Sequence, residues 1–388
     1  MRRFYFDHNA TTPVSQSVLE VLVAALLEVP GNASSIHQDG QLARQRLEAS
    51  RREVAVLLGC EPKELVFTSG GTEADNLAIL GAVNAVVTPF DKHVITTQIE
   101  HPAVLNTCRE LYPSGVKLTL VPPRPDGVVD PEDIRRAMRP ETVLVSVMHA
   151  NNELGVIQPI AEIAKIAHAA GVAMHSDGVQ AAGKVPVNVE ALDVDLYSIS
   201  GHKFYSTKGV GALYVRNGTK LRPIQFGGKH ERERRAGTEN VPGAVAMGKA
   251  AAIVHSTLPL EPDRVAALRD RLETGILARV PDTGVNGAGV ARTPNTTNIY
   301  FDGLEGEAMV ISLDLKGFAV SSGSACSSGA VEPSHVLLAM GLPKDRARAS
   351  VRFSLGASND EAQVDALIEA VAESAAKLRK LSPTYTSA

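Results

Sequence analysis

The sequence contains no tryptophan, and aromatic residues make up only 4% of its 388 residues. Proteins that bind single-stranded nucleic acid commonly stack bases on aromatic side chains, so this scarcity argues against such a surface. The formal net charge of −4 also provides no basic face for phosphates. We therefore expect no direct contact with nucleic acid.

Cysteine is equally scarce. The chain has three cysteines, Cys60, Cys108 and Cys326, and no two of them form a Cys-x-x-Cys pair. A sparse and odd number is typical of a reducing compartment and supplies neither a disulfide framework nor a zinc site. We expect no metal centre.

Long hydrophobic segments are absent too. Asp7 and His8 come too early for the apolar core of a signal peptide to precede them. The longest apolar stretch, residues 18–29, is interrupted by Glu20 and Glu28 and is too short to span a bilayer. These features predict a cytoplasmic protein with no membrane contact.

What remains is an ordinary globular composition, with 44% hydrophobic and 21% charged residues. Between residues 60 and 215, short apolar β-branched runs alternate with segments of helical period. Several runs are apolar at consecutive positions, as strands buried on both faces must be. The expected strands are residues 64–68, 93–97, 117–121, 142–148, 172–175, 194–199 and 209–215. This alternation predicts an α/β fold with a mostly parallel sheet covered by helices on both sides.

After residue 215 the regular alternation of strands and helices ends, and the helical stretches are interspersed with only two strand candidates. The final helix, expected over residues 360–381, has Asn359 as its candidate N-cap. We expect a large domain over residues 15–255. A smaller α/β domain would comprise residues 1–14 and 256–388 and carry a loop of small residues at 321–330.

Polar residues follow successive strands of the expected sheet. The segments after the strands begin with Ser69-Gly70-Gly71-Thr72, with Glu100-His101, with Asn151-Asn152, with Asp177 and with Ser200-Gly201-His202-Lys203. Taken singly, each is explained by a helix cap, a turn or a surface side chain. Taken together, they place phosphate donors, an imidazole, an amide, a carboxylate and an amine at one rim, where open parallel sheets bind ligands. Pyridoxal phosphate needs that set of groups.

The same residues carry a family resemblance that covers nearly the whole chain. The chain resembles the class V, fold-type I pyridoxal-phosphate enzymes, and among them the group I cysteine desulfurases of the NifS/IscS type. The motifs are FDHNATTP (6–13), TSGGTE (68–73), EH (100–101), NNELG (151–155), SGHK (200–203), RAGTEN (235–240), SSGSACSSG (321–329) and RFSLG (352–356). The resemblance implies a fold-type I transferase fold with a large cofactor-binding domain and a smaller C-terminal α/β domain.

The resemblance also implies roles for residues around the cofactor. Lys203 would form the covalent link to the cofactor aldehyde, and Asp177 would keep the pyridine nitrogen protonated. His101 would stack on the ring and move protons, and Gln180 would contact the ring hydroxyl. The phosphate would be bound by Gly71, Thr72, Ser200 and His202, with Thr238 arriving from the partner subunit of a homodimer.

For the substrate, the resemblance implies that Asn152 and Arg352 bind the carboxylate of L-cysteine. Lys203 would remove the α-proton, and Cys326 would take the sulfur as a persulfide, leaving L-alanine. Cys60 and Cys108, each on a helix-like stretch, are expected to be buried and inert. The persulfide would pass to an acceptor protein that serves iron–sulfur cluster assembly, tRNA thiolation or DNA phosphorothioation.

Two alternatives remain beside this interpretation. A selenocysteine lyase or another aminotransferase-like enzyme would keep the cofactor and change the reaction, and a scaffold would bind the cofactor without catalysis. The sequence also departs from the family pattern at Ala33, at Ser206-Thr207, at Lys229 and at Glu233. None of these positions carries a chemical role, and the last two precede Thr238 in a loop.

Overall fold

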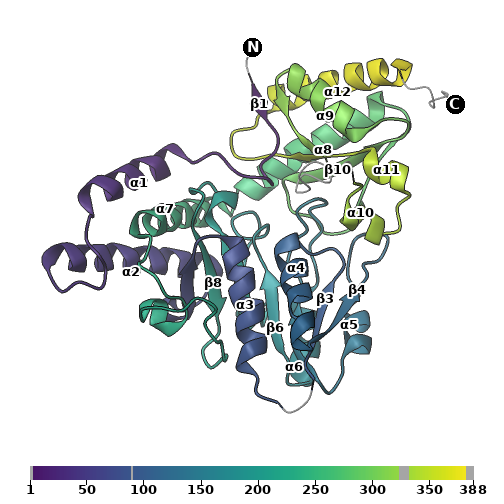
Figure 1. The fold of residues 1–388 in the computed structure, drawn as a ribbon. Coiled ribbons are helices and arrows are strands. Elements are labelled where there is room, and N and C mark those ends of the chain that lie inside the picture. The colour runs from purple at the N-terminus through teal and green to yellow at the C-terminus, as the bar shows by residue number, and fades with distance from the viewer. Residues whose placement is uncertain (1–2, 89–90, 323–331, 382–388) are drawn as a thin grey trace.

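The computed structural model describes residues 3–88, 91–322 and 332–381. Cys326 and most of the expected loop 321–330 therefore lie outside the described residues. Figure 1 shows a large sheet with helices on its faces and, beside it, a smaller group of elements that contains β1 and most of the C-terminal elements. Within the described ranges, no helix combines the length and the apolar character that a membrane span requires.

The large sheet has seven strands in the order β2-β8-β7-β6-β5-β3-β4. From β7 to β4 all pairings are parallel, whereas β8 is antiparallel to both of its neighbours, β2 and β7. The mostly parallel sheet that the sequence predicts is confirmed. The strands are β2 (Leu65–Thr68), β3 (His93–Thr97), β4 (Lys117–Val121), β5 (Thr142–Ser146), β6 (Ala173–Asp177), β7 (Leu196–Ser200) and β8 (Gly211–Val215).

Helices cover both faces of this sheet because alternate strand residues point to opposite sides. In β2, Val66 joins the core beneath α3 (Gly71–Ala85) and α4 (Pro102–Glu110). Its neighbours Leu65 and Phe67 join the opposite core. The helices on that second face are α2 (Gln38–Leu58), α5 (Pro131–Ala137), α6 (Ile160–Ala169) and α7 (Val241–Thr257).

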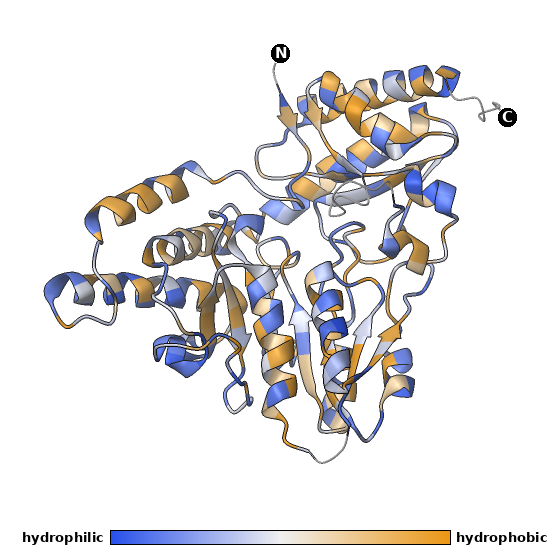
Figure 2. Ribbon diagram, in the orientation of Figure 1, coloured by the Kyte–Doolittle hydropathy of each residue, from blue (hydrophilic) through white to orange (hydrophobic). Residues whose placement is uncertain are grey.

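Helix α1 (Gln16–Glu28) lies at the edge of the molecule and packs on α7. Only Val18 and Ala25 of this helix are buried. Its outer face leaves Leu19, Leu26 and Leu27 exposed, and Figure 2 shows the helix as largely hydrophobic. An apolar face of this kind on a surface helix is typical of an interaction site.

The smaller group has its own antiparallel sheet, in the order β12-β13-β10-β9, and its own core around Phe301 and Phe353. The strands are β9 (Thr283–Val285), β10 (Thr296–Phe301), β12 (Ser321–Ser322) and β13 (Ser350–Ser354). The helices are α8 (Glu261–Arg279), α9 (Gly306–Leu315) and α12 (Glu361–Leu381). Strand β1 (Phe4–Tyr5) pairs with β11 (Phe318–Ala319), so the N-terminus is part of this group.

Two details differ from expectation. Asp360, not Asn359, caps α12, because its Oδ1 accepts a hydrogen bond from the Gln363 amide at 2.8 Å. The helices α10 (His335–Ala339) and α11 (Lys344–Arg348) pack into the core of the large sheet, not into the Phe301 core. The division at residues 14 and 255 remains a prediction.

Candidate active site

The carboxyl ends of the parallel strands open onto a cavity of about 380 Å³. Every residue expected to bind the cofactor lines it except Thr238, and Arg352 from β13 lines it as well. The lining residues are Asn9, Ala10, Gly71, Thr72, Asp75, His101, Met148, Asn152, Asp177, Val179, Gln180, Ser200, His202, Lys203 and Arg352. Residues up to 343 positions apart in sequence are thus brought to one rim.

The first wall is the N-terminus of α3, which begins at Gly71 directly after β2. A Cβ on Gly71 would lie 2.7 Å from Val179 Cγ2, so a side chain there would close the space between α3 and Val179. Glu73 fixes the loop, since it accepts from the Ser69 amide and from Arg235 Nε, both at 2.7 Å. The helix N-terminus and the missing side chain together suit an anion such as a phosphate.

Lys203 follows β7 in the short helix η3 (Gly201–Lys203). Its Nζ donates hydrogen bonds to the backbone carbonyls of Asn9 at 2.6 Å and of Ala10 at 2.9 Å. Thr12 braces the same loop, because its Oγ1 accepts from the Tyr205 amide at 2.6 Å and donates to the His202 carbonyl at 2.9 Å. The N-terminal segment therefore holds the lysine in place.

Asp177 ends β6 and is 5% exposed. Its Oδ1 accepts a hydrogen bond from the Val179 amide at 2.9 Å. Burial raises the pKa of its carboxyl to about 6, while that hydrogen bond and the charge of Lys203 oppose the rise. A cationic partner in the cavity, such as a protonated ring nitrogen, would hold this carboxyl in its ionised form.

His101 is the N-cap of α4, and its Nδ1 accepts from the Ala103 amide at 3.1 Å. Burial, followed by the positive charge of Lys203, lowers the pKa of His101 to about 4. The ring is therefore neutral near pH 7. Since Nδ1 is an acceptor, the proton must lie on Nε2.

Arg352 reaches the cavity from β13 with a side chain that is 3% exposed. Its Nη2 donates to Asp7 Oδ1 at 2.7 Å, and its Nη1 donates to the Asn152 carbonyl at 3.1 Å. Its Nε is buried and has no hydrogen-bond partner within the described ranges. A guanidinium fixed in this way retains donors for a carboxylate.

The sequence interpretation missed three contributors to this site. Asn9 accepts from Lys203 and Gln180 through its carbonyl and from Lys184 Nζ through its side chain at 2.9 Å. Lys184 is partly buried, and its pKa is lowered well below the usual value by desolvation and by the charges of Lys203 and Arg352. Asp75 is the third. The motif FDHNATTP contains Asn9, but the pattern does not say that its backbone would contact the lysine.

The two described cysteines lie away from this cavity. Cys108 is buried in α4, and burial raises the pKa of its thiol to about 12. Cys60 follows the C-cap of α2 instead of lying on a helix, and it is only partly buried. Burial also raises its pKa to about 12, so both thiols stay protonated and unreactive near neutral pH.

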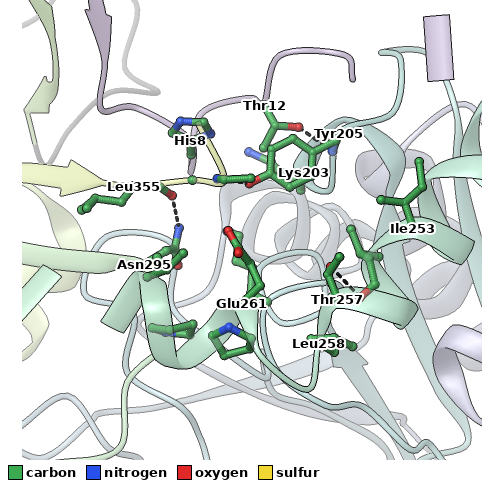
Figure 3. Close-up of a pocket in the computed structure, with 18 of the residues that line it drawn as sticks. His8, Thr12, Lys203, Tyr205, Ile253, Thr257, Leu258, Glu261, Asn295 and Leu355 are labelled. Carbon is green, nitrogen blue, oxygen red and sulfur yellow. Dashed lines mark hydrogen bonds between the residues drawn. The ribbon is translucent and has the colours of Figure 1, made fainter. Parts of the chain in front are cut away.

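A second cavity, of about 220 Å³, also has Lys203 in its lining (Figure 3). Its walls are mostly apolar and include Ile253, Leu258 and Leu355. Asp177, His101 and the α3 N-terminus do not line it. Lys203, Asp177 and His101 all line the first cavity, which is therefore the candidate active site.

A mostly parallel sheet whose strand ends bring a lysine, a buried aspartate and an anion-binding helix N-terminus into one cavity defines an α/β enzyme of the pyridoxal-phosphate type. The chain belongs to the aminotransferase class-V family, whose model matches residues 4–367.

Curated relatives resemble the chain over nearly its full length. A cysteine desulfurase of Nostoc sp. (strain PCC 7120) is 47% identical over 99% of this chain and 95% of its own. The cysteine desulfurase IscS of Anaeromyxobacter dehalogenans is 48% identical over 98% and 94%. Among solved structures, a NifS-like protein superimposes with a TM-score of 0.91 at 36% identity, covering 97% of this chain and all of that one. SspA in complex with cysteine gives 0.80 at 34% identity, over 90% and 98%.

Proposed function

We propose that the protein removes sulfur from L-cysteine, giving L-alanine and a persulfide on Cys326. The observation that carries the proposal is the single cavity lined by Lys203, Asp177 and Arg352. Near-complete similarity to curated cysteine desulfurases supports it. SspA, whose structure is described as a complex with cysteine, resembles the chain over most of its length.

Pyridoxal phosphate is the cofactor that cysteine desulfurases of this family use, and the residues present fit it. Gly71 and Thr72 at the start of α3, with Ser200 and His202, would hold the phosphate. Asp177 would pair with the ring nitrogen, Gln180 would contact the ring hydroxyl and Lys203 would bind the aldehyde carbon. When bound, the cofactor supplies an electron-withdrawing ring that stabilises negative charge at the substrate Cα.

The substrate would be oriented by its carboxylate. We assign that group to Arg352 and to Asn152, because both line the cavity and the guanidinium is already fixed by Asp7. A fixed guanidinium binds both carboxylate oxygens without first losing the freedom of a mobile side chain. A carboxylate bound there would keep the substrate inside the cavity that Lys203 and His101 also line.

Proton transfer would be divided between two side chains. Lys203 would remove the proton from Cα, since it follows β7 and lines the cavity. The carbonyls of Asn9 and Ala10, which accept its hydrogen bonds, would stabilise the ammonium group that results. His101 would stack on the ring and donate the proton that it carries on Nε2. The neutral imidazole suits that role, because it can give up one proton and regain one.

Sulfur transfer is assigned to Cys326, which lies outside the described residues. Its thiolate would attack the substrate sulfur, so that an S–S bond forms while the substrate Cβ–S bond breaks. The electron pair of the broken bond stays with the carbon product, which becomes alanine on protonation. Neither Cys60 nor Cys108 can replace it, because both are held as thiols away from the cavity.

The test uses Cys326→Ala, with Cys60→Ala as the matched control. The Cys326 variant should keep the visible absorption of the bound cofactor and produce no alanine from cysteine. The Cys60 variant should behave like the wild type. Alanine formation by Cys326→Ala at the wild-type rate would contradict the proposal, and the same assay with selenocysteine distinguishes a selenocysteine lyase. A scaffold without catalysis would give no alanine with any variant.

We further propose a homodimer in which Thr238 binds the phosphate of the partner's cofactor. Thr238 does not line the cavity of its own chain, which supports this assignment. The exposed apolar face of α1 supports self-association. Light scattering should give twice the chain mass. Thr238→Ala should weaken cofactor binding without changing that mass.

The destination of the sulfur is the remaining part of the proposal. A protein-bound persulfide calls for an acceptor protein, and iron–sulfur cluster assembly, tRNA thiolation and DNA phosphorothioation are the candidate uses. We assign the reaction to the cytoplasm, since a reducing compartment keeps Cys326 available as a thiol. Capture of the ³⁵S-labelled acceptor protein from the native cytosol would identify the pathway that receives the sulfur.

A further inference from the structure

A second buried carboxyl group, that of Asp75, lines the same cavity as Asp177. Asp75 is on α3, one helical turn after Gly71. The residue is 1% exposed, and its Oδ1 has no hydrogen-bond partner among the described residues. The role of this buried acid must be explained separately, because the proposed reaction does not use it.

The nearest basic group does not neutralise Asp75. His175 Nε2 lies 3.6 Å from Asp75 Oδ1. Both ring nitrogens of His175 also contact hydroxyls, Nδ1 that of Ser146 at 2.8 Å and Nε2 that of Ser198 at 3.0 Å. Complete burial lowers the pKa of His175 to about 3, so the ring is neutral and is no counter-ion.

The other ionisable groups that face Asp75 are acids. Asp177 lies at the end of β6, Glu100 follows β3 and Cys108 comes from α4. Glu100 is also fully buried; its Oε1 accepts from Thr97 Oγ1 at 2.6 Å and from the Met148 amide at 3.0 Å. The positive charge of Lys203 acts on Asp177. Within the part of the chain that the structure describes, the charges that act on Asp75 come from the acids Asp177 and Glu100. An ionised carboxylate at Asp75 would therefore be buried among like charges, which is strongly unfavourable.

We propose that Asp75 is a positioning residue that stays uncharged near Asp177 and leaves the negative charge of this acidic cluster on Asp177, beside the ring nitrogen of the cofactor. The inference rests on the proposed cofactor site. Burial and the charges of Asp177 and Glu100 raise the pKa of Asp75 far above its usual value, and hydrogen bonding to Ser198 only partly opposes this.

The consequence for the site follows from the coupling between like charges. Two carboxylates close together cannot both ionise readily, and the second charge raises the pKa of the first. If Asp75 ionised, Asp177 would tend to take up a proton and could no longer hold the ring nitrogen protonated. A neutral Asp75 does not repel the negative charge of Asp177, so Asp177 can stay ionised. The protonated Asp75 carboxyl can also donate a hydrogen bond within the cluster.

The first experiment compares Asp75→Asn with Asp75→Leu in the full-length protein. Asp75→Asn keeps an uncharged polar group of the same shape, so the Kd for pyridoxal phosphate should stay within about twofold of wild type. The pH dependence of the bound cofactor's absorption should be unchanged. Asp75→Leu removes the hydrogen bond and should raise that Kd about tenfold or more. A pH midpoint displaced by about one unit in Asp75→Asn would show that Asp75 carries a charge and would overturn the proposal.

The second experiment does not depend on the cofactor or on desulfurase activity. The infrared difference spectrum between cofactor-free wild type and Asp75→Asn at pH 7.5 should show the carbonyl stretch of a protonated carboxylic acid. The Asp91→Asn variant, which changes an exposed aspartate, should show a carboxylate band instead. A carboxylate band for Asp75 would overturn the proposal. If the protonated band appears but the protein does not bind pyridoxal phosphate, the proposed function fails independently.

Discussion

Arg352 donates from Nη2 to Asp7 Oδ1 at 2.7 Å, so an ion pair joins two residues that are 345 positions apart in sequence. The pair connects β13 to the segment that follows β1. Arg352 also donates to the carbonyl of Asn152 in the large-sheet part of the molecule. One guanidinium thus links three parts of the chain at the rim of the active-site cavity.

Arg352→Lys should raise the KM for L-cysteine about 10- to 100-fold, because a charge-assisted hydrogen bond contributes about 1.5–3 kcal/mol. A lysine ammonium keeps the charge but cannot bind both carboxylate oxygens in one plane. Steady-state alanine formation measures the effect. The visible absorption should be unchanged, and the exposed Arg348→Lys is the control. A KM equal to that of wild type would exclude Arg352 from carboxylate binding.

A buried ion pair anchors the segment that leads to Thr238. Arg51 bonds both oxygens of Glu231 at 2.7 Å, and each side chain is 2% exposed. Arg51→Met should lower the free energy of unfolding by about 3–5 kcal/mol, because it leaves a buried carboxylate unpaired. Urea unfolding measures the loss. In the double variant with Glu231→Gln, the loss should be smaller than the sum of the single losses, and strict additivity would contradict the coupling.

Glu233 follows two other non-glycine residues with positive φ, and its own φ is 65°. Glu233→Gly should stabilise the protein by about 0.5–1 kcal/mol, since about 1–2 kcal/mol of backbone strain is relieved and glycine's extra unfolded-state entropy offsets part of it. The Glu233 side chain also forms an exposed ion pair with Lys229 at 2.9 Å, and Lys229→Ala breaks this pair without changing the backbone at Glu233. Urea unfolding should show little change for that control. If both variants changed the free energy of unfolding equally, the change would come from the ion pair and not from backbone strain at Glu233.

Burial lowers the pKa of His149 to about 4. Between about pH 6.5 and 4 the unfolded chain binds a proton at this residue and the folded chain does not. The stabilisation is complete above about pH 6.5 and is lost as the pH falls. Relative to His149→Gln, wild type should lose up to about 1.4 kcal/mol per pH unit in this window. Urea unfolding at pH 7.5, 6 and 5 tests this, and parallel curves would contradict it.

Much of the fold could be predicted because strands buried on both faces have continuous apolar runs in their sequence. The direction of β8 could not be predicted in this way. Its residues alternate between the two cores, with Ala212 and Tyr214 in one and Leu213 in the other. That pattern is the same in either strand direction, so only the pairing shows that β8 is antiparallel.

The candidate site was predictable where side-chain chemistry marks it, as for Lys203, Asp177 and His101. It was not predictable where backbone atoms act, because the carbonyls of Asn9 and Ala10 that hold Lys203 are common to every residue type. Asp75 was missed for a different reason. An aspartate near the start of a helix is usually explained by the helix dipole, and only the fold shows that it is buried and lines the same cavity as Asp177.

In the proposed reaction, Cys326 receives the sulfur released at the Lys203 cavity. The most direct test is one turnover with ³⁵S-labelled L-cysteine, followed by alkylation, proteolysis and mass spectrometry of the labelled peptide. We expect one equivalent of alanine for each labelled sulfur, with all label on the peptide that contains Cys326. Label on Cys60 or Cys108, or alanine formed without any protein-bound sulfur, would contradict it.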